Sequence, residues 1–163
     1  MTRVLVVHHS PGSAPPQLLD AALGGMRQPE LEGVEVVVRE ALAAEAADVL
    51  AADGILLGTP ANFGYMSGAL KHFFDRVFLD VGGSLEPDGR AAAAAGPARL
   101  PLGLYVHGGY DATGAVRSVQ RITDALGWRA VAEPVVVTGA PTDADRERVA
   151  DLAATLAATA VGW

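Results

Sequence analysis

The stretch Gly58-Thr-Pro-Ala-Asn-Phe-Gly-Tyr-Met-Ser-Gly-Ala-Leu-Lys-His-Phe-Phe-Asp-Arg76 runs from a strand through an irregular loop into a helix. Upstream of it, Ile55-Leu-Leu57 is a continuous apolar run, which is typical of a central parallel strand with both faces covered. A loop leaving the carboxyl end of such a strand lies where open α/β sheets bind ligands. Downstream, helical spacing predicts one buried helix face, formed by Met66, Leu70, Phe73, Phe74, Val77 and Phe78.

The same stretch closely resembles the second cofactor loop of the flavodoxin-like flavoproteins, in particular the branch of NAD(P)H-dependent FMN reductases and quinone reductases. The family pattern reads roughly Gly-[Ser/Thr]-Pro-x-[Tyr/Asn]-Phe-Gly-x-Met-Ser-Gly-x-Leu-Lys-x-Phe-x-Asp-Arg, and this chain carries nearly all of it. In that family the loop runs along the isoalloxazine ring of FMN. The resemblance therefore implies a cofactor-binding segment composed of Thr59, Pro60, Ala61, Asn62, Phe63 and Gly64.

The rest of the chain repeats the strand and helix pattern. Short β-rich runs predict further strands at 4–7, 34–38, 102–106 and 131–137. Five strands alternating with five helices predict a parallel sheet with helices on both faces, because crossover connections are right-handed. This alternation does not give the strand order. The resemblance implies a flavodoxin-like three-layer sandwich with five parallel strands in the order 2-1-3-4-5.

Helix positions follow from apolar spacing and from end signals. The second helix is expected to bury Leu42, Ala46, Val49 and Leu50. Thr142 with Asp145 resembles a capping box that opens the last helix. The region 81–101 contains glycines, prolines and alanines without a clear pattern, and it is too long for an ordinary connection. We expect it to be a long loop or flap within one domain spanning 1–163, used to cover a cofactor or to form a dimer interface.

In the order 2-1-3-4-5, the loops after strands one, three and four lie side by side at the carboxyl edge of the sheet. The first loop, Ser10-Pro-Gly-Ser-Ala-Pro-Pro16, is expected to bind the FMN phosphate through Ser10, Gly12, Ser13 and the start of the following helix. It departs from the family's loop, which has hydroxyls and amide donors at more positions. Its three prolines have no N–H to donate.

The third loop carries His107, Gly108, Gly109 and Tyr110. By their position and their glycines, these residues correspond to the family loop that touches the pyrimidine side of the flavin. The resemblance implies that Tyr110 stacks on or shields the ring and that His107 donates to a flavin carbonyl or to N1. The alternative for His107 is a loop histidine whose ring is bonded by the backbone.

Composition excludes several functions. The formal charge of the 163 residues is −7, with a single lysine, Lys71, which does not fit a nucleic-acid footprint or an anionic membrane surface. The absence of cysteine excludes disulfides and thiol redox chemistry. Met1 to His8 has only four consecutive apolar residues, so we expect a first strand rather than a signal peptide. No run is long enough to span a membrane, and a cytoplasmic location is expected.

Other chemistries have little support in the sequence. His8 and His9 are adjacent and point to opposite faces of a strand, and His72 lies on a helix, so we expect no metal site. No Gly-x-Ser-x-Gly elbow occurs, and no Ser-His-Asp set can be assigned by spacing. We therefore expect no side chain to act as acid, base or nucleophile, and any redox chemistry must come from a bound cofactor.

The sequence therefore predicts a flavodoxin-like oxidoreductase that binds FMN and uses it to pass electrons from NADH or NADPH to a quinone, flavin or similar small acceptor. The resemblance also implies a possible homodimer. Two alternatives stay open. The first is a one-electron carrier that docks on partner proteins, for which an acidic surface is suitable. The second is an interaction module that has lost FMN, which the prolines of the first loop favour.

Overall fold

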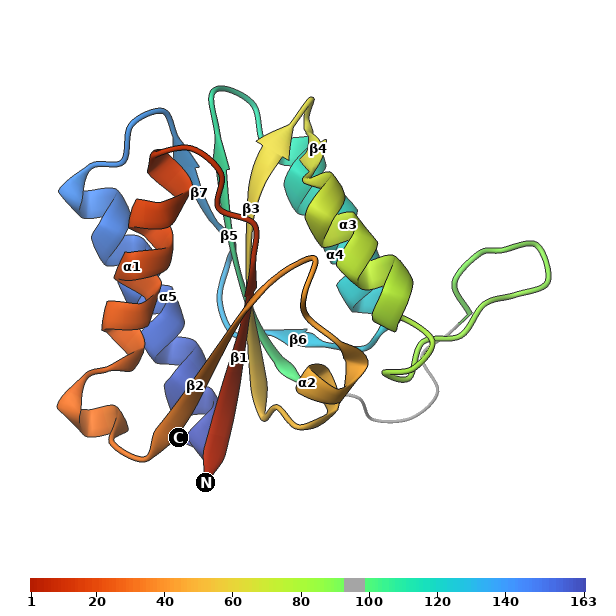
Figure 1. Cartoon of the computed structure of the whole chain (residues 1–163), viewed down its shortest axis with the longest axis horizontal. Coiled ribbons are helices and arrows are strands. Elements are labelled where there is room, and N and C mark those ends of the chain that lie inside the picture. The colour runs from red at the N-terminus through yellow and green to blue at the C-terminus, as the bar shows by residue number, and fades with distance from the viewer. Residues whose placement is uncertain (93–98) are drawn as a thin grey trace.

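The structure, a computed structural model, describes residues 1–92 and 99–163 (Figure 1). Its sheet has the order β2-β1-β3-β5-β6, and β7 also pairs with β5. The parallel core consists of β1 (Thr2–His8), β2 (Val34–Glu40), β3 (Gly54–Asn62) and β5 (Pro101–Gly108). The flavodoxin-like class and the strand order expected from the sequence are confirmed.

The last strand differs from the expectation. Instead of one strand at 131–137, the structure has β6 (Arg129–Ala130) beside the start of β5 and β7 (Val135–Thr138) beside its end. Pro134 lies between them and has no N–H for a ladder hydrogen bond, so the strand is interrupted there. The sheet edge beside β5 therefore consists of two separate short strands.

A second difference is a small hairpin at the end of β3. β4 (Tyr65–Met66) pairs antiparallel with Ala61 and Asn62. Together with the split last strand, it brings the described part of the chain to seven strands instead of five. The expected helix face included Met66, which is buried but belongs to β4, and the helix itself starts after Ser67.

Helices cover both faces of the sheet (Figure 1). α1 (Ala14–Met26) and α5 (Asp143–Val161) pack together on one face, and α3 (Gly68–Val77) and α4 (Thr113–Ala125) cover the other. Alternate residues of each strand enter the two cores, so Leu56 and Tyr105 face the first pair while Leu57 and Leu104 face the second. The expected capping box of Thr142 and Asp145 starts α5.

The second helix is shorter than expected. α2 (Ala46–Leu50) begins with a capping box between Glu45 and Asp48, and the residues before it form turns. Val49 is buried, but Leu42 and Leu50 are exposed, so the expected face was wrong at both leucines. One helical turn presents too few positions to bury all four residues. A 3-10 turn, η1 (Pro29–Leu31), precedes β2.

The expected loop at 81–101 is described only in part, because residues 93–98 lie outside the described residues. Leu85 and Ala91 form a bridge that closes a small turn. This turn lies beyond the end of α3, away from the carboxyl ends of the strands (Figure 1), so up to residue 92 it does not cover that edge. In the described ranges, no helix has the length and apolar character needed to cross a bilayer.

Candidate functional site

The loops after β1, β3, β5 and β7 meet at one end of the molecule, opposite the two chain termini (Figure 1). The backbone joins them in pairs. The N–H of His9 donates to the carbonyl of Gly58 at 3.0 Å, which ties the first loop to β3. The N–H of Gly139 donates to the carbonyl of Gly108 at 2.9 Å, which ties the loop after β7 to β5. This edge is the expected ligand-binding edge of an open α/β sheet.

The second loop is held by its own polar groups. The Thr59 hydroxyl is buried, donates to the carbonyl of Pro60 at 2.8 Å and accepts the N–H of Ser67 at 3.0 Å. Ser67 in turn caps α3, because its hydroxyl accepts the N–H of Leu70. The Met66 N–H donates to Ser118 on α4 at 3.3 Å. The hydroxyls of Thr59 and Ser67 are therefore used in hydrogen bonds that stabilise the loop and the start of α3.

The tip of the hairpin presents an aromatic ring to solvent. Phe63 and Gly64 have φ of +51° and +74°, the signs that a two-residue type I′ turn requires at both central positions. For Phe63 this conformation is strained, because a side chain rarely adopts it. The Phe63 ring is 100% exposed. Asn62 is exposed and Ala61 half-buried beside it.

The first loop has unused donors. In the described part of the chain, the N–H groups of Ser10, Gly12 and Ser13 have no hydrogen-bond acceptor. Ser13 is the N-cap of α1, but its hydroxyl makes no capping hydrogen bond. Gly12 has φ of +73°. The N–H groups of Gly12 and Ser13 directly precede a 13-residue helix whose dipole favours an anion, while Pro15 and Pro16 in its first turn have no N–H to add.

Beneath the first loop lies a buried polar cluster. The Nδ1 atom of His8 lies 2.8 Å from the Ser10 hydroxyl. Burial lowers the pKa of His8, against the opposing effect of Glu40. Tyr105 lies on β5, where it pairs with Gly58 of β3, and its side chain is 2% exposed. Burial raises the pKa of the Tyr105 hydroxyl, and the Ser10 hydroxyl offsets part of this rise, so both His8 and Tyr105 are neutral near pH 7.

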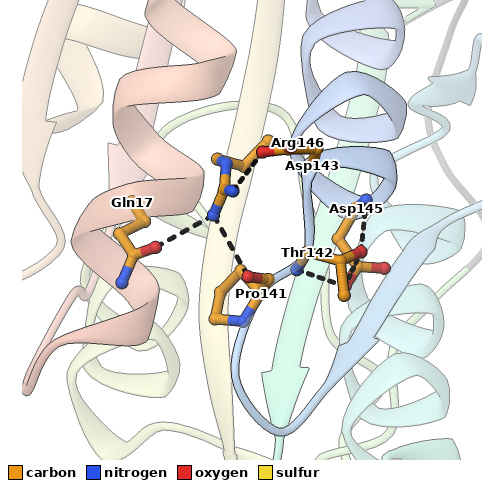
Figure 2. A network of polar contacts seen from close by, with 6 residues as sticks. All are labelled: Gln17, Pro141, Thr142, Asp143, Asp145 and Arg146. Carbon is orange, nitrogen blue, oxygen red and sulfur yellow. Dashed lines mark hydrogen bonds and ion pairs between the residues drawn. The ribbon is translucent and has the colours of Figure 1, made fainter.

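The helix that follows the first loop is braced from α5. Figure 2 shows Arg146 donating to the side chain of Gln17 and to the carbonyl of Pro141, both at 3.1 Å. Gln17 donates to the carbonyl of Ser13, the residue before α1. The charge of Arg146 is balanced by Asp143 at 2.5 Å. The network fixes the start of α1 without bringing a free positive charge to the loop.

The third loop combines an anchored residue with an exposed one. His107 is half-buried, and its Nε2 lies 2.8 Å from the carbonyl of Gly139, so that nitrogen carries a proton and is bonded by the backbone. Gly108 is buried, and a Cβ placed on it would lie 3.4 Å from Ala61, so the second and third loops are in contact. Gly109 and Tyr110 are exposed. The Tyr110 side chain borders a cavity of about 530 Å³ between α4 and β7.

The structure thus brings the three expected loops to one edge, but it also shows residues that the sequence did not single out. His8 was considered only as a metal ligand, and Tyr105 only as part of a strand. The available signal was their position: each is a polar residue near the end of an apolar strand, and both side chains fall on the α1 face. Their proximity depends on the strand register, which the sequence does not give.

Comparison with known proteins places the chain in a family. Residues 26–141 match the family model described as NADPH-dependent FMN reductase. The chain belongs to this family. The matched range contains the second and third loops, whereas the first loop and α5 lie wholly outside it.

Two relatives of known sequence and one solved structure extend the comparison. The chain is 36% identical over 94 residues to a flavodoxin of Aquifex aeolicus, a match that covers 58% of this chain and 49% of the relative. It is 30% identical over 133 residues to an NAD(P)H dehydrogenase (quinone) of Acidithiobacillus ferrooxidans, covering 69% and 62%. It therefore spans about half to three fifths of these relatives. An archaeal flavodoxin structure has a TM-score of 0.77 at 16% identity over 98% of this chain and 99% of that chain.

Proposed function

We propose that the chain binds FMN non-covalently at the carboxyl edge of its sheet and acts as an NAD(P)H-dependent oxidoreductase. The observation that carries the proposal is the set of unused donors in the first loop. Ser10, Gly12 and Ser13 offer N–H groups without acceptors, directly before a helix whose dipole favours an anion. Membership of the FMN reductase family supports the same conclusion for the second and third loops.

The residues at the edge fit the parts of FMN. Ser10, Gly12 and Ser13 would hold the phosphate, and the segment from Thr59 to Gly64 would line the ring system. The exposed rings of Phe63 and Tyr110 and the glycines at 108 and 109 would border the ring on the third-loop side. Because Nε2 of His107 is bonded to Gly139, only its Nδ1 remains available to the cofactor.

The protein residues would orient the cofactor and control access. Bound FMN would supply the redox chemistry, namely acceptance of a hydride from NADH or NADPH and transfer of two electrons to a quinone, flavin or similar small acceptor. No acid or base from the chain is required for this. The part of residues 81–101 that the structure describes leaves the edge uncovered, so a nicotinamide and an acceptor could use the same face in turn.

The test is a visible absorbance spectrum of the purified protein, followed by titration with FMN while its fluorescence is recorded. We expect a flavin band or saturable quenching, and then flavin-dependent oxidation of NADH or NADPH with a quinone present. FMN binding without nicotinamide oxidation would instead indicate a one-electron carrier. A colourless protein that does not respond to FMN would contradict the proposal.

A second candidate is a cofactor-free interaction module. Pro11, Pro15 and Pro16 favour it, because each removes an N–H from the first loop or from the first turn of α1. The unpaired donors of the same loop are compatible with both candidates, since water satisfies exposed N–H groups at the start of any helix. The FMN titration separates the two candidates.

A further inference from the structure

The hydroxyl of Tyr105 lies in the core without a hydrogen-bond partner. The side chain is 2% exposed, and in the described residues no group within hydrogen-bonding geometry meets its oxygen. A buried hydroxyl that bonds to nothing is costly, and a phenylalanine would fill the same space without that cost. His8 and Tyr105 pair with Gly58 from its two sides in the sheet register, and the Tyr105 hydroxyl lies over Gly58, two residues along the strand from the start of the first loop at Ser10 on the His8 side. This placement indicates a role for the hydroxyl that the protein alone does not complete.

The neighbouring strand makes room for this side chain. A Cβ placed on Gly58 would lie 2.2 Å from the ring carbon that carries the Tyr105 hydroxyl and 2.3 Å from the hydroxyl oxygen. Any other residue at 58 would displace the tyrosine. The carbonyl of Gly58 also accepts the N–H of His9, so Gly58 contacts both the Tyr105 ring and the start of the first loop.

The hydrogen-bonding capacity of Ser10 explains the arrangement. A serine hydroxyl accepts two hydrogen bonds and donates one. His8 Nδ1 lies 2.8 Å from the Ser10 oxygen, and the Tyr105 hydroxyl lies over Gly58, the residue that pairs with His8 in the sheet. If His8 Nδ1–H and Tyr105 O–H both donate to Ser10, its two acceptor positions are filled. The single O–H of Ser10 is then left to donate outward, beside the unpaired N–H groups of Gly12 and Ser13.

We propose that Tyr105 and His8 are positioning residues that direct the Ser10 hydroxyl toward the phosphate of a flavin nucleotide. This rests on the proposed binding of FMN. Tyr105 belongs to β5 and His8 to β1. By orienting the Ser10 hydroxyl, they provide one directed donor in a loop whose prolines have no N–H. Neither touches the ligand, and both act through Ser10. The binding of a phosphate draws the Ser10 oxygen into one orientation, gives the Tyr105 hydroxyl its partner, and selects the His8 tautomer with the proton on Nδ1.

The first test compares FMN with riboflavin, which has the same ring system and no phosphate. Tyr105→Phe removes the hydroxyl alone, and we expect it to weaken FMN binding about fivefold to tenfold while riboflavin binding changes less than about twofold. Thr123→Val is the matched control, because it removes a buried hydroxyl from the far part of α4. It should change neither affinity, and thermal melts should show that both variants fold.

The outcomes are distinguishable. Equal weakening of FMN and riboflavin by Tyr105→Phe, or no weakening of FMN, overturns the positioning role and leaves the proposed function intact. Wild-type protein that binds neither flavin overturns both. His8→Asn keeps an N–H donor near the Nδ1 position and should retain most of the FMN affinity, whereas His8→Leu has no donor there and should lose it as Tyr105→Phe does.

A second readout does not use flavin affinity. Long-range ¹H–¹⁵N spectra report which ring nitrogen of a neutral histidine carries the proton, and His8→Asn identifies the His8 signals. We expect the Nδ1–H tautomer of His8 when FMN or inorganic phosphate is bound. A His8 that stays protonated on Nε2 with FMN bound would show that Nδ1 accepts the Ser10 proton, and it would overturn the proposal.

Discussion

The first and second loops of the candidate site use their polar groups in opposite ways. In the second loop, the hydroxyls of Thr59 and Ser67 form hydrogen bonds with backbone groups, and the Met66 N–H of the hairpin donates to Ser118 on α4. In the first loop, the N–H groups of Ser10, Gly12 and Ser13 have no acceptor in the described chain. The buried hydroxyls of the second loop are thus all hydrogen-bonded, and its Phe63 ring is exposed. The first loop keeps backbone N–H groups that no acceptor of the described chain meets.

The difference between the two loops shows that a strong match to the family pattern does not by itself identify the residues that bind the ligand. The second loop carries nearly all of the family pattern, and much of that pattern maintains a hairpin and a helix cap. The first loop departs from the pattern, yet it holds the polar groups that lack a partner. We therefore expect changes in the second loop to reduce stability first, and changes in the first loop to reduce phosphate affinity first.

The largest effect is expected at the point where the two loops meet. Gly58→Ala would place a methyl group 2.2 Å from the Tyr105 ring, and it should destabilise the protein by about 2 to 3 kcal/mol because a buried ring must move. Urea unfolding measures this change. Gly24→Ala is the control, because no atom lies within 4 Å of its Cβ, and it should stabilise α1 by about 0.5 kcal/mol. A Gly58→Ala protein as stable as wild type would mean that Tyr105 is loosely packed.

The contrast between the loops is tested directly by two hydroxyl deletions. Thr59→Val leaves the N–H of Ser67 buried without a partner and should cost about 2 kcal/mol of unfolding free energy. Ser13→Ala removes a hydroxyl that makes no capping bond, so stability should change by less than about 0.5 kcal/mol while FMN affinity falls. Urea unfolding and FMN titration of both variants measure this. The opposite pattern would reverse the roles of the two loops.

The strain at the hairpin tip predicts a smaller, stabilising effect. Phe63→Asn places a residue that tolerates positive φ in the type I′ turn, and it should raise stability by about 0.5 to 1 kcal/mol. Phe63→Leu keeps the strain and should give no gain, which makes it the control in thermal unfolding. If Phe63 borders the flavin ring, Phe63→Asn should weaken FMN and riboflavin equally. A loss of stability in Phe63→Asn would show that the ring has a packing role.

The smallest effect concerns pH. Burial lowers the pKa of His8 below its ordinary value of 6.5, so the unfolded chain takes up a proton before the folded chain does as the pH falls. Stability is therefore fully present above pH 6.5 and decreases as the pH falls through the lowered pKa. His9 adds to this lowering and Glu40 opposes it. Subtracting the profile of His8→Asn isolates the effect, and a difference independent of pH would contradict it.

Most of the scaffold could be predicted because its signals are local. The apolar spacing from Leu70 to Val77 gave the buried face of α3, and Thr142 with Asp145 gave the start of α5. The interruption at Pro134 and the hairpin at Phe63 were missed because each depends on which residues a strand pairs with. The strand order itself came from the resemblance.

The site could be predicted only at the level of its loops. Position along the sequence indicated which loops share the edge, since the carboxyl ends of parallel strands meet there. It did not indicate which hydroxyls are free, because Thr59 is engaged by a residue eight positions away. The grouping of the first loop with Tyr105 depends on the strand register, which pairs Gly58 with His8 on one side and with Tyr105 on the other.

The most direct test of this account is the ratio of the dissociation constants of riboflavin and FMN for the wild-type protein. If the free donors of the first loop bind the phosphate, FMN should bind at least about tenfold more tightly than riboflavin, which corresponds to one or two charge-assisted hydrogen bonds. Equal affinities for the two flavins would contradict the account. They would mean that the second and third loops hold the ring alone and that the donors of the first loop serve no ligand.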